Sequence, residues 1–592
     1  MLDLESLFSE QELIKLLCKY RANVANKRHA RHMIRNVSLH KSSNKIAITD
    51  QHSDFIFIQE KFPSRRDWKK LNQQERKVCK DSLKINQRRL FKSYEFTKRA
   101  IENGSTVPTW YQNLMSFIEE IKQEIHNIEH SNYKISEPNI RGIKKEEKDN
   151  KIIYRPIALY EPKDKIICSI TAKYLTAYFE HLFVELDCSY AFRPKNASNH
   201  VPNHHDCIQK IVDYKKVNNG LWVAECDIQK FFDTVEHNHI VKVFDELANK
   251  IHLSNDLILD PKARKIFLLF LSSFSFQKNI LQLNEEWFKI NRLPFGEFSW
   301  AEDKLNKKFG ENYTSNNRIG VPQGNAISCF IANLILHNVD ESINKLDPNI
   351  FYIRYCDDMI LMHKEQDKCS EALKIFMKGI NDNFLLYHEP DKILNYKETS
   401  VSRRFWKSKS KEPFFWGDKN VNESNVPWVS FVGYQIDFHG RVRVRKSTLK
   451  KETTKQVSET QKVLKALGKF HRNNIIEDQN ARLSKFQIVF RTRQKLISMS
   501  VGRLSIHNHT KPHEQGLCWT NGFKMLKSNK ISSRQLRYLD KTRNHQLQRV
   551  SNELKKIIKE TESEVVSPKK KKKKVIYFGG AFSYLNFLKH NK

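Results

Sequence analysis

The sequence lacks the cysteine spacing that marks a zinc ribbon or a disulfide framework. Its ten cysteines are scattered over 592 residues, and no two of them form a CxxC pair. This absence excludes a cysteine ribbon and favours a reducing compartment. The histidine-rich stretch NHVPNHHDC (199–207) has no second group of ligands in the chain, so we interpret it as a polar loop.

Long apolar runs are also missing. The longest one, IFLLFLSSFSF (266–276), is too short to span a bilayer. The first residues, MLDLESLFSEQELIKLL, carry acidic side chains where a signal peptide needs basic ones. We therefore expect a soluble, cytoplasmic protein that has no membrane partner.

Acidic residues are few for the number of basic ones. The chain has 67 Asp and Glu against 103 Lys and Arg, which gives a formal net charge of +36. Residues 441–592 alone hold 37 basic and 10 acidic side chains, or +27 of that total. An excess of this size predicts a polyanionic partner, first of all nucleic acid, that contacts the last quarter of the chain.

Four segments can be distinguished along the chain. Residues 1–140 are expected to be a helical N-terminal extension, and residues 141–440 alternate between strand-like and helical stretches with turns between them. Residues 441–560 are basic and helical, and residues 561–592 hold a lysine run followed by a short aromatic tail. The pattern predicts an α+β core that is preceded and followed by helical regions.

Two adjacent carboxylates interrupt the apolar stretch FYIRYCDDMILM (351–362). The aromatic and branched residues on both sides predict two short strands, with the bend at 356–358. Asp357 and Asp358 then lie at the tip of a hairpin, where their charges repel each other. Because a fold tolerates such a pair where a cation neutralises it, we expect a metal ion there.

A third carboxylate follows another buried strand. In LWVAECDIQKFFDTVEH (221–237), residues 221–226 predict a strand and Asp227 stands at its end. Two Mg²⁺ ions about 3.5 to 4 Å apart need oxygen ligands from more than one chain segment, and these acids can supply them. Such a site can perform in-line phosphoryl transfer.

A turn bracketed by glycines lies between these two acidic segments. NNRIGVPQGNAISCFIANLILHNVDESI (316–343) begins as this turn and continues as a helix. Gly320 and Gly324 allow close backbone approach, so the loop can hold Gln323 against a flat partner such as a base or a sugar. One face of the helix carries branched apolar residues: Ile331, Ile335, Val339 and Ile343.

Taken in this order, the three segments resemble the palm motifs of the reverse transcriptase family, which read DxxxFFDxV, GxPQGxxxS and YxDD. Further stretches resemble the fingers and the thumb entry of bacterial members: YRPIALYEPKDKIICSI (154–170), SYAFRP (189–194) and FVGYQIDFHGRVRVRKSTLKK (431–451). The chain is most similar to the defence-associated bacterial reverse transcriptases of the "unknown group".

The resemblance implies a right-hand fold of fingers, palm and thumb. It also implies a polymerase that joins a primer 3′-hydroxyl to the α-phosphate of a dNTP. Asp227, Asp357 and Asp358 would hold two Mg²⁺ ions, for which Mn²⁺ can substitute. The backbone carbonyl of Ile228 would be a further ligand.

The resemblance also assigns a nucleotide site. The ring of Phe232 would exclude ribose at the 2′ position. Arg155 would bind the triphosphate with its planar guanidinium, assisted by Lys148 or Lys151. Lys392 falls near the position of a lysine that protonates departing pyrophosphate.

Other residues would complete the contacts with nucleotide and nucleic acid. Gln323 and Gly324 of the PQG loop would line the nucleotide site. Arg193 of SYAFRP would contact the template or brace the fingers. At the thumb entry, four basic residues would contact nucleic acid: Arg441, Arg443, Arg445 and Lys446.

The expected function is RNA-directed DNA synthesis in anti-phage defence, in the bacterial cytoplasm. The expected partners are a non-coding RNA, the DNA product and dNTPs, together with a second protein or a second copy of the chain. One alternative is synthesis by the same site without a template, or from a protein primer at Tyr577, Ser583 or Tyr584. Another alternative is a group II intron-like maturase or RNA-binding scaffold with a vestigial palm.

Overall fold

A computed structural model describes residues 3–37, 53–78, 82–472, 485–498, 522–527, 529–562 and 583–585. The chain divides into two compact units. The core unit comprises Met1–Glu12, Ile118–Val432 and Ile436–Arg441, and the helical unit comprises Leu13–Phe117, Gly433–Gln435 and Val442–Lys592. Both units are discontinuous in sequence, and each is described by itself.

The described part of residues 1–140 is largely helical, as the sequence predicts. A buried apolar stripe explains the start of the second helix, in which Leu13 and Leu17 are fully buried. The helices are α1 Leu4–Leu7, α2 Glu10–Val37, α3 Ser53–Glu60, α4 Gln73–Val78, α5 Ser82–Glu102 and α6 Thr109–His126.

The core unit is built on two antiparallel arrangements of strands. The first is the hairpin of β1 (Asn139–Lys148) and β2 (Lys151–Leu159). The second is a five-stranded sheet in the order β4-β5-β3-β6, with β7 also pairing with β3. Its strands are β3 Trp222–Gln229, β4 Phe351–Tyr355, β5 Asp358–His363, β6 Leu386–Tyr387 and β7 Lys411–Phe415. Mixed strands and helices confirm the predicted α+β class.

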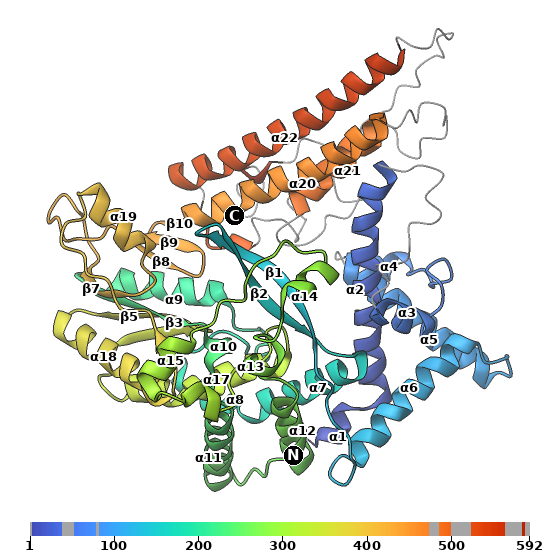
Figure 1. The fold of residues 1–592 in the computed structure, drawn as a ribbon, viewed down its shortest axis with the longest axis horizontal. Helices are drawn as coiled ribbons and strands as arrows, with labels where there is room; N and C mark the ends of the chain where they lie inside the picture. The colour runs from blue at the N-terminus through green and yellow to red at the C-terminus, as the bar shows by residue number, and fades with distance from the viewer. Residues whose placement is uncertain are drawn as a thin grey trace. The chain divides into compact units, whose positions relative to one another are not determined.

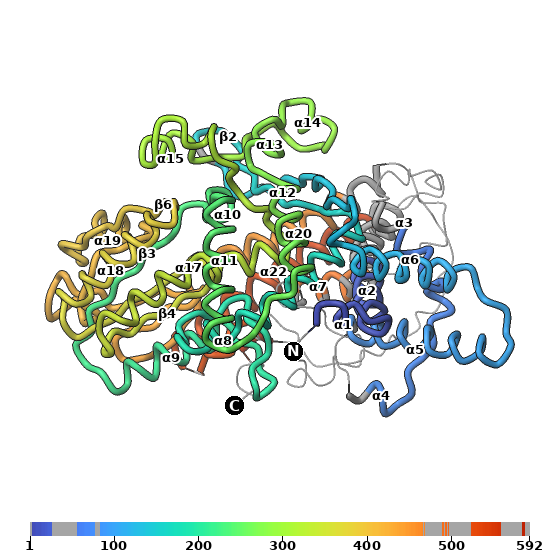
Figure 2. The backbone as a smooth tube through the Cα atoms, turned by 90° about the horizontal axis from the view of Figure 1, so that it is seen from below, coloured from blue at the N-terminus to red at the C-terminus, as the bar shows by residue number. Residues whose placement is uncertain are grey.

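Helices pack around this sheet. Among them, α17 (Ala326–Asn344) follows the glycine-bracketed turn, and the side chain of Asn325 caps it by accepting the backbone N–H of Ile327. The predicted apolar face of α17 is buried, but its other sides are buried as well, because α7 (Pro162–Tyr178), α8 (Glu180–Leu186) and α18 (Gln366–Asp382) pack against it. Figure 2 shows α17 and α18 beside β3 and β4.

The remaining helices of the core unit are mostly short. They are α9 His204–Val217, α10 Phe231–Thr234, α11 His237–Asn255, α12 Pro261–Ser272, α13 Phe276–Asn279, α14 Glu285–Ile290, α15 Glu302–Phe309, α16 Tyr313–Asn316 and α19 Thr399–Lys407.

Three long helices dominate the C-terminal part of the helical unit (Figure 1): α20 Lys446–Arg472, α21 Lys485–Ser498 and α22 Lys530–Glu562. They share an apolar core to which each contributes, listed here in chain order: Val463, Leu467, Ile488, Val550 and Leu554. The chain reaches these helices through a three-stranded sheet, β8 Trp428–Phe431, β9 Tyr434–Asp437 and β10 Val442–Val444. Of the helices described, none combines the length and the apolar composition that a bilayer crossing requires.

Candidate active site

The acidic hairpin is tighter than the sequence predicts. β4 and β5 are joined by only Cys356 and Asp357, because Tyr355 and Asp358 already form a pair of the ladder. The predicted bend at 356–358 is therefore wrong by one residue, and Asp358 is the first residue of β5. Cys356 has φ +60°, and a positive φ at the first loop residue suits a two-residue hairpin because it matches the strand twist.

The sheet register brings the three predicted acids together. β3 continues to Gln229, so Asp227 lies within the strand and not at its end. In the ladder between β3 and β5, Asp227 is directly opposite Asp358. Asp357 directly precedes Asp358 in the sequence. Residues directly opposite in an antiparallel pair lie close, so carboxylates from two distant segments meet at one edge of the sheet.

The charges of these acids act on one another. Burial raises the pKa of Asp357 above the usual aspartate value, and the negative charge of Asp227 raises it further. Carboxylate oxygens in such an arrangement are the donors that Mg²⁺ prefers. Within the described ranges, however, no three His, Cys, Asp or Glu side chains are arranged to hold a metal ion.

A lysine from another segment forms an ion pair with Asp227. The Lys409 ammonium donates to Oδ2 of Asp227 at 2.8 Å, and Nε2 of His388 lies 3.4 Å from the same oxygen. The backbone N–H of Asp227 donates to Oγ of the buried Ser410 at 2.9 Å. Burial and the Lys409 charge lower the pKa of His388, whose Nε2 lies 3.3 Å from the Lys409 ammonium.

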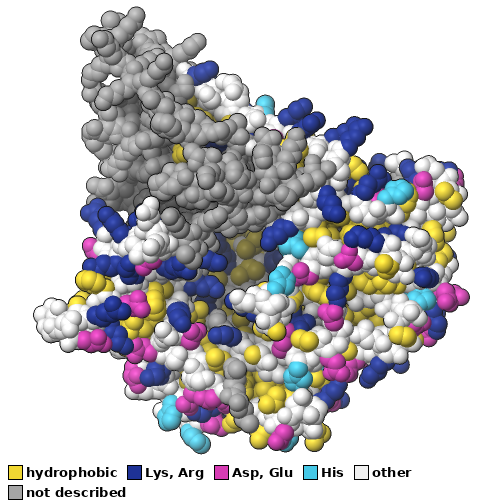
Figure 3. All heavy atoms as spheres, turned by 180° about the vertical axis from the view of Figure 1, so that it is seen from behind, with side chains coloured by type: hydrophobic (Ala, Val, Ile, Leu, Met, Phe, Trp, Pro, Cys, Tyr) yellow, Lys and Arg dark blue, Asp and Glu magenta, His cyan; other side chains and the backbone are white. Residues whose placement is uncertain are grey.

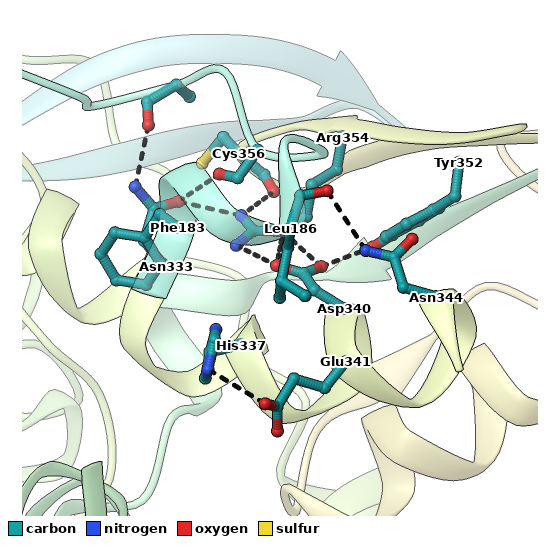
Figure 4. A network of polar contacts seen from close by, with 12 residues as sticks. Phe183, Leu186, Asn333, His337, Asp340, Glu341, Asn344, Tyr352, Arg354 and Cys356 are labelled. Atoms are coloured by element: carbon teal, nitrogen blue, oxygen red, sulfur yellow. Dashed lines mark hydrogen bonds and ion pairs between the residues drawn. The ribbon is translucent and has the colours of Figure 1, made fainter. Parts of the chain in front are cut away.

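A buried polar network supports the acidic hairpin from below (Figure 4). Arg354 on β4 donates from Nε and Nη2 to the Asp340 carboxylate of α17, at 2.7 to 2.9 Å, and both side chains are 1% exposed. Nη1 of Arg354 donates to Asn333 at 2.9 Å, and Tyr352 donates to Asp340 at 2.8 Å. Asn333 also accepts from Ser189 at 2.9 Å, which links the hairpin to the SYAFRP segment.

The PQG loop is anchored on two sides. Gly320 has φ +91° and Gly324 has φ +102°, so both need the conformation that glycine adopts freely. The side-chain amide of Gln323 donates to Oδ1 of Asp233 at 2.7 Å, and its backbone carbonyl accepts from Ala158 of β2 at 3.0 Å. The loop therefore holds Gln323 in a fixed position beside α10.

The segment after Asp227 divides into a packed and an accessible part. Phe231 is 2% exposed and belongs to the core, whereas Phe232 is half-buried. Burial raises the pKa of Asp233 to about 6, although Gln323 and the charges of Lys230 and Arg155 lower it. Phe232 is thus the aromatic ring of the pair that a ligand can reach.

Most other predicted nucleotide contacts lie on exposed positions. Arg155 is exposed on β2, and its positive charge lowers the pKa of Asp233. Lys151 forms an ion pair with Glu297 at 3.7 Å, and the Lys148 side chain lies outside the described residues. Lys392 is exposed in the loop that follows β6.

Three of the remaining predicted contacts have structural partners. Ile228 is buried beside Asp227 and pairs with Tyr387 of β6. Arg441 donates to Asp437 at 2.5 Å, and Arg443 donates to Gln435 at 3.0 Å. At the start of α20, the Arg445 side chain is half-buried and the Lys446 side chain is exposed.

Arg193, for which the sequence left a template contact and a bracing role open, is bonded inside the protein. Arg193 is only 9% exposed, and its guanidinium donates to both carboxylate oxygens of Glu180, to the carbonyl of Phe183 and to that of Ser189. Since the donors are used inside the protein, Arg193 braces α8 against the SYAFRP loop. This is the second of the two roles that the sequence left open.

Several residues of the site carry no sequence signal. Lys409 and His388 lie in no motif, and Lys409 is 182 residues away from Asp227. The positive charges of Lys145 on β1 and Lys304 on α15 lower the pKa of Lys230 and the pKa of His388. Asp233 stands within the quoted motif, and its place after two phenylalanines was the signal that could have indicated it.

Comparison with known proteins identifies the stretch that holds Asp227, Asp357 and Asp358. The family "Reverse transcriptase (RNA-dependent DNA polymerase)" matches residues 143–402. An uncharacterised 91 kDa protein in the cob intron of Schizosaccharomyces pombe is 24% identical over 198 residues, which are 33% of this chain and 18% of that protein. The chain thus spans less than a fifth of this relative's length.

Some solved structures resemble the chain loosely. Apo telomerase from Candida tropicalis has a TM-score of 0.35 and 11% identity, over 76% of this chain and 72% of that one. Telomerase from Candida albicans with a fragment of telomeric RNA has a TM-score of 0.32 and 10% identity, over 95% and 82%. These scores are too low to support a conclusion. The family match does support one: residues 143–402 hold a reverse transcriptase domain.

Proposed function

We propose that this chain is an RNA-directed DNA polymerase, which extends a 3′-hydroxyl with dNTPs. One observation carries the proposal: in the reverse transcriptase domain, the ladder sets Asp227 opposite Asp358, beside Asp357. Clustered carboxylates cost free energy, and a phosphoryl-transfer site is a reason to keep them. The right-hand layout belongs to the proposal, with β3–β7 as palm, the β1–β2 hairpin as fingers and α20–α22 as thumb.

Oxygen donors from two strands suit Mg²⁺, and Asp227, Asp357 and Asp358 would hold it with the carbonyl of Ile228. When bound, Mg²⁺ would lower the pKa of the primer hydroxyl and stabilise the departing pyrophosphate. The chain's own residues place the substrates. Burial, and then the negative charge of Asp227, raise the pKa of Asp357, as the neighbouring carboxylates of such a site would.

The nucleotide would bind between β2, α10 and the PQG loop. Arg155 supplies an exposed guanidinium there, and Lys148 or Lys151 would assist it. Phe232 offers a half-buried ring on α10, and Asp233 fixes Gln323. Gly324 keeps the loop surface free of a side chain, and Lys392 would meet pyrophosphate.

Primer extension on a defined RNA template tests the activity. With Mg²⁺ and dNTPs, the purified chain should make DNA complementary to the template, whereas Asp227→Asn should not. The exposed acid Asp213, which pairs with Lys216, gives a matched control in Asp213→Asn. DNA made in the absence of the template, with a sequence unrelated to it, would support untemplated synthesis instead.

The protein-primed alternative has less support. Ser583 donates its hydroxyl to Asp540 at 2.7 Å, and Tyr584 is fully buried with its hydroxyl bonded to the carbonyl of Leu496 at 3.3 Å. Neither hydroxyl is presented to a nucleotide. Tyr577 lies outside the described residues.

The cellular setting is the less supported part of the proposal. We keep anti-phage defence in the bacterial cytoplasm, with a non-coding RNA, as the setting that the motifs favour. The intron location in the name of the Schizosaccharomyces pombe relative supports the maturase alternative. Sequencing the nucleic acid that co-purifies with the chain separates them: intron RNA would favour the maturase, and another structured RNA the defence system.

A further inference from the structure

We infer that Lys409 competes with a divalent cation for the Asp227 carboxylate, and so weakens the affinity of the site for the metal ion. The inference rests on the proposed function, because it takes Asp227 as a metal ligand. Its starting point is that the ammonium lies 2.8 Å from Oδ2 of Asp227. A carboxylate oxygen that accepts a hydrogen bond from an ammonium group attracts a metal ion less strongly. The ammonium group and the metal ion also repel each other.

The backbone that follows Lys409 is fixed against β3. Lys411 pairs with Glu225 in the ladder between β3 and β7, and their side chains form a buried ion pair. Ser410 is fully buried, accepts from the backbone N–H of Asp227, and its carbonyl accepts from Asp391 at 3.0 Å. The backbone of Lys409 therefore stays at a distance from which its side chain can reach Asp227.

The side chain itself is able to leave. Lys409 is 57% exposed, while the Asp227 side chain is 16% exposed. His388 offers the ammonium a second partner at 3.3 Å. An ion pair with one partner this exposed is weak, so a divalent cation can displace it at an affinity cost of about two- to fivefold.

Metal binding to the full-length chain without nucleic acid tests the inference directly. Titration with Mn²⁺, followed by the electron paramagnetic resonance of the free ion and competed with Mg²⁺, gives the dissociation constant. Lys409→Met and Lys409→Gln should bind about two- to fivefold more tightly than the wild type. Lys409→Arg should bind like the wild type, because it keeps the charge.

A matched control separates this effect from net charge. Lys407→Met removes the same charge from an exposed position two residues away, and should leave the dissociation constant unchanged. Equal or weaker binding by Lys409→Met, or an equal gain in Lys407→Met, would overturn the inference.

A third variant separates the inference from the proposed function. Asp227→Asn should weaken Mn²⁺ binding. If it does and Lys409→Met binds like the wild type, only the role of Lys409 is wrong. If Asp227→Asn binds like the wild type, Asp227 is not a ligand and the metal site of the proposed function fails too.

Discussion

At the scale of single residues, the sequence indicated which acids lie together but not which side chains surround them. Asp227, Asp357 and Asp358 stand in recognisable motifs, and strand patterns predicted their neighbourhood. Lys409 and His388 could not be predicted, because only the folded register of β3, β6 and β7 places them at Asp227. Arg193 illustrates the reverse case, since a basic residue in a family motif proved to be buried and internally bonded.

Phe232 carries a prediction about substrate choice. Phe232→Val should lower the preference for dNTPs over ribonucleotides by roughly 10- to 100-fold, because the ring that opposes the 2′-hydroxyl is lost. Single-nucleotide incorporation with each substrate measures this ratio. Phe231→Leu is the control: this ring is buried, so the change should lower stability and leave the ratio alone. An unchanged ratio in Phe232→Val would contradict the role of Phe232 in excluding ribonucleotides.

Asp233 carries a prediction about pH. Its pKa is raised to about 6 in the folded chain, and an unfolded aspartate titrates near about 3.9. Between these values the folded chain keeps a proton that the unfolded chain has lost. Stability from this group is therefore present below about pH 4 and is lost as pH rises to about 6.

Asp233→Asn should remove this loss. We expect it to stabilise the core unit by about 2 to 3 kcal/mol at pH 7.5, and by little at pH 4, since asparagine can still accept from Gln323. Urea unfolding at both pH values measures the difference. The same gain at both would show that ionisation of Asp233 is not the cause.

At the scale of elements, the strands and the long helix were predictable and the network below the hairpin was not. Alternation and apolar runs predict β3, β4, β5 and α17, because each buries one continuous set of side chains. The buried pair of Arg354 and Asp340 joins β4 to α17, and nothing in the local sequence shows that a charged residue in a strand finds its partner in a helix. The bend was misplaced by one residue for a similar reason, because pairing of Tyr355 with Asp358 decides where the turn ends.

This network predicts an asymmetry between single and double substitutions. Arg354→Met leaves the Asp340 charge buried and unpaired, and should cost about 3 to 5 kcal/mol of unfolding free energy. Arg354→Met with Asp340→Leu removes both charges and should recover much of that loss. Denaturant unfolding of the wild type, the single variant and the double variant measures their free energies of unfolding. If the double variant is no more stable than the single one, burial of an unpaired charge is not the source of the cost.

At the scale of the whole molecule, charge is the dominant feature. Lys and Arg side chains spread over the described part of the face in Figure 3, with fewer acids between them, as the net charge of +36 leads one to expect. The sequence alone was sufficient for this point, since it needs only counting. The grouping of residues 13–117 with the C-terminal helices in one compact unit has no such signal in composition or motif.

The charge predicts a steep salt dependence of RNA binding. For six or more phosphate contacts, affinity should fall by roughly 10³-fold between about 50 and 200 mM salt. Lys446→Ala, at the exposed start of α20, should reduce the slope by about one whatever the RNA sequence. Lys368→Ala is a control, because Lys368 already pairs with Glu371. A slope that stays constant in Lys446→Ala would exclude this residue from the phosphate contacts.

The central claim is that three carboxylates, brought together by the β3–β5 register, make this chain a polymerase. The most direct measurement is incorporation of labelled dNTP on an RNA template with Mg²⁺, by the wild type, Asp357→Asn and the exposed control Asp367→Asn. We expect the wild type and the control to incorporate label equally. Asp357→Asn should lose at least about 10³-fold while it folds and binds RNA as before. Equal incorporation by all three proteins would contradict the account.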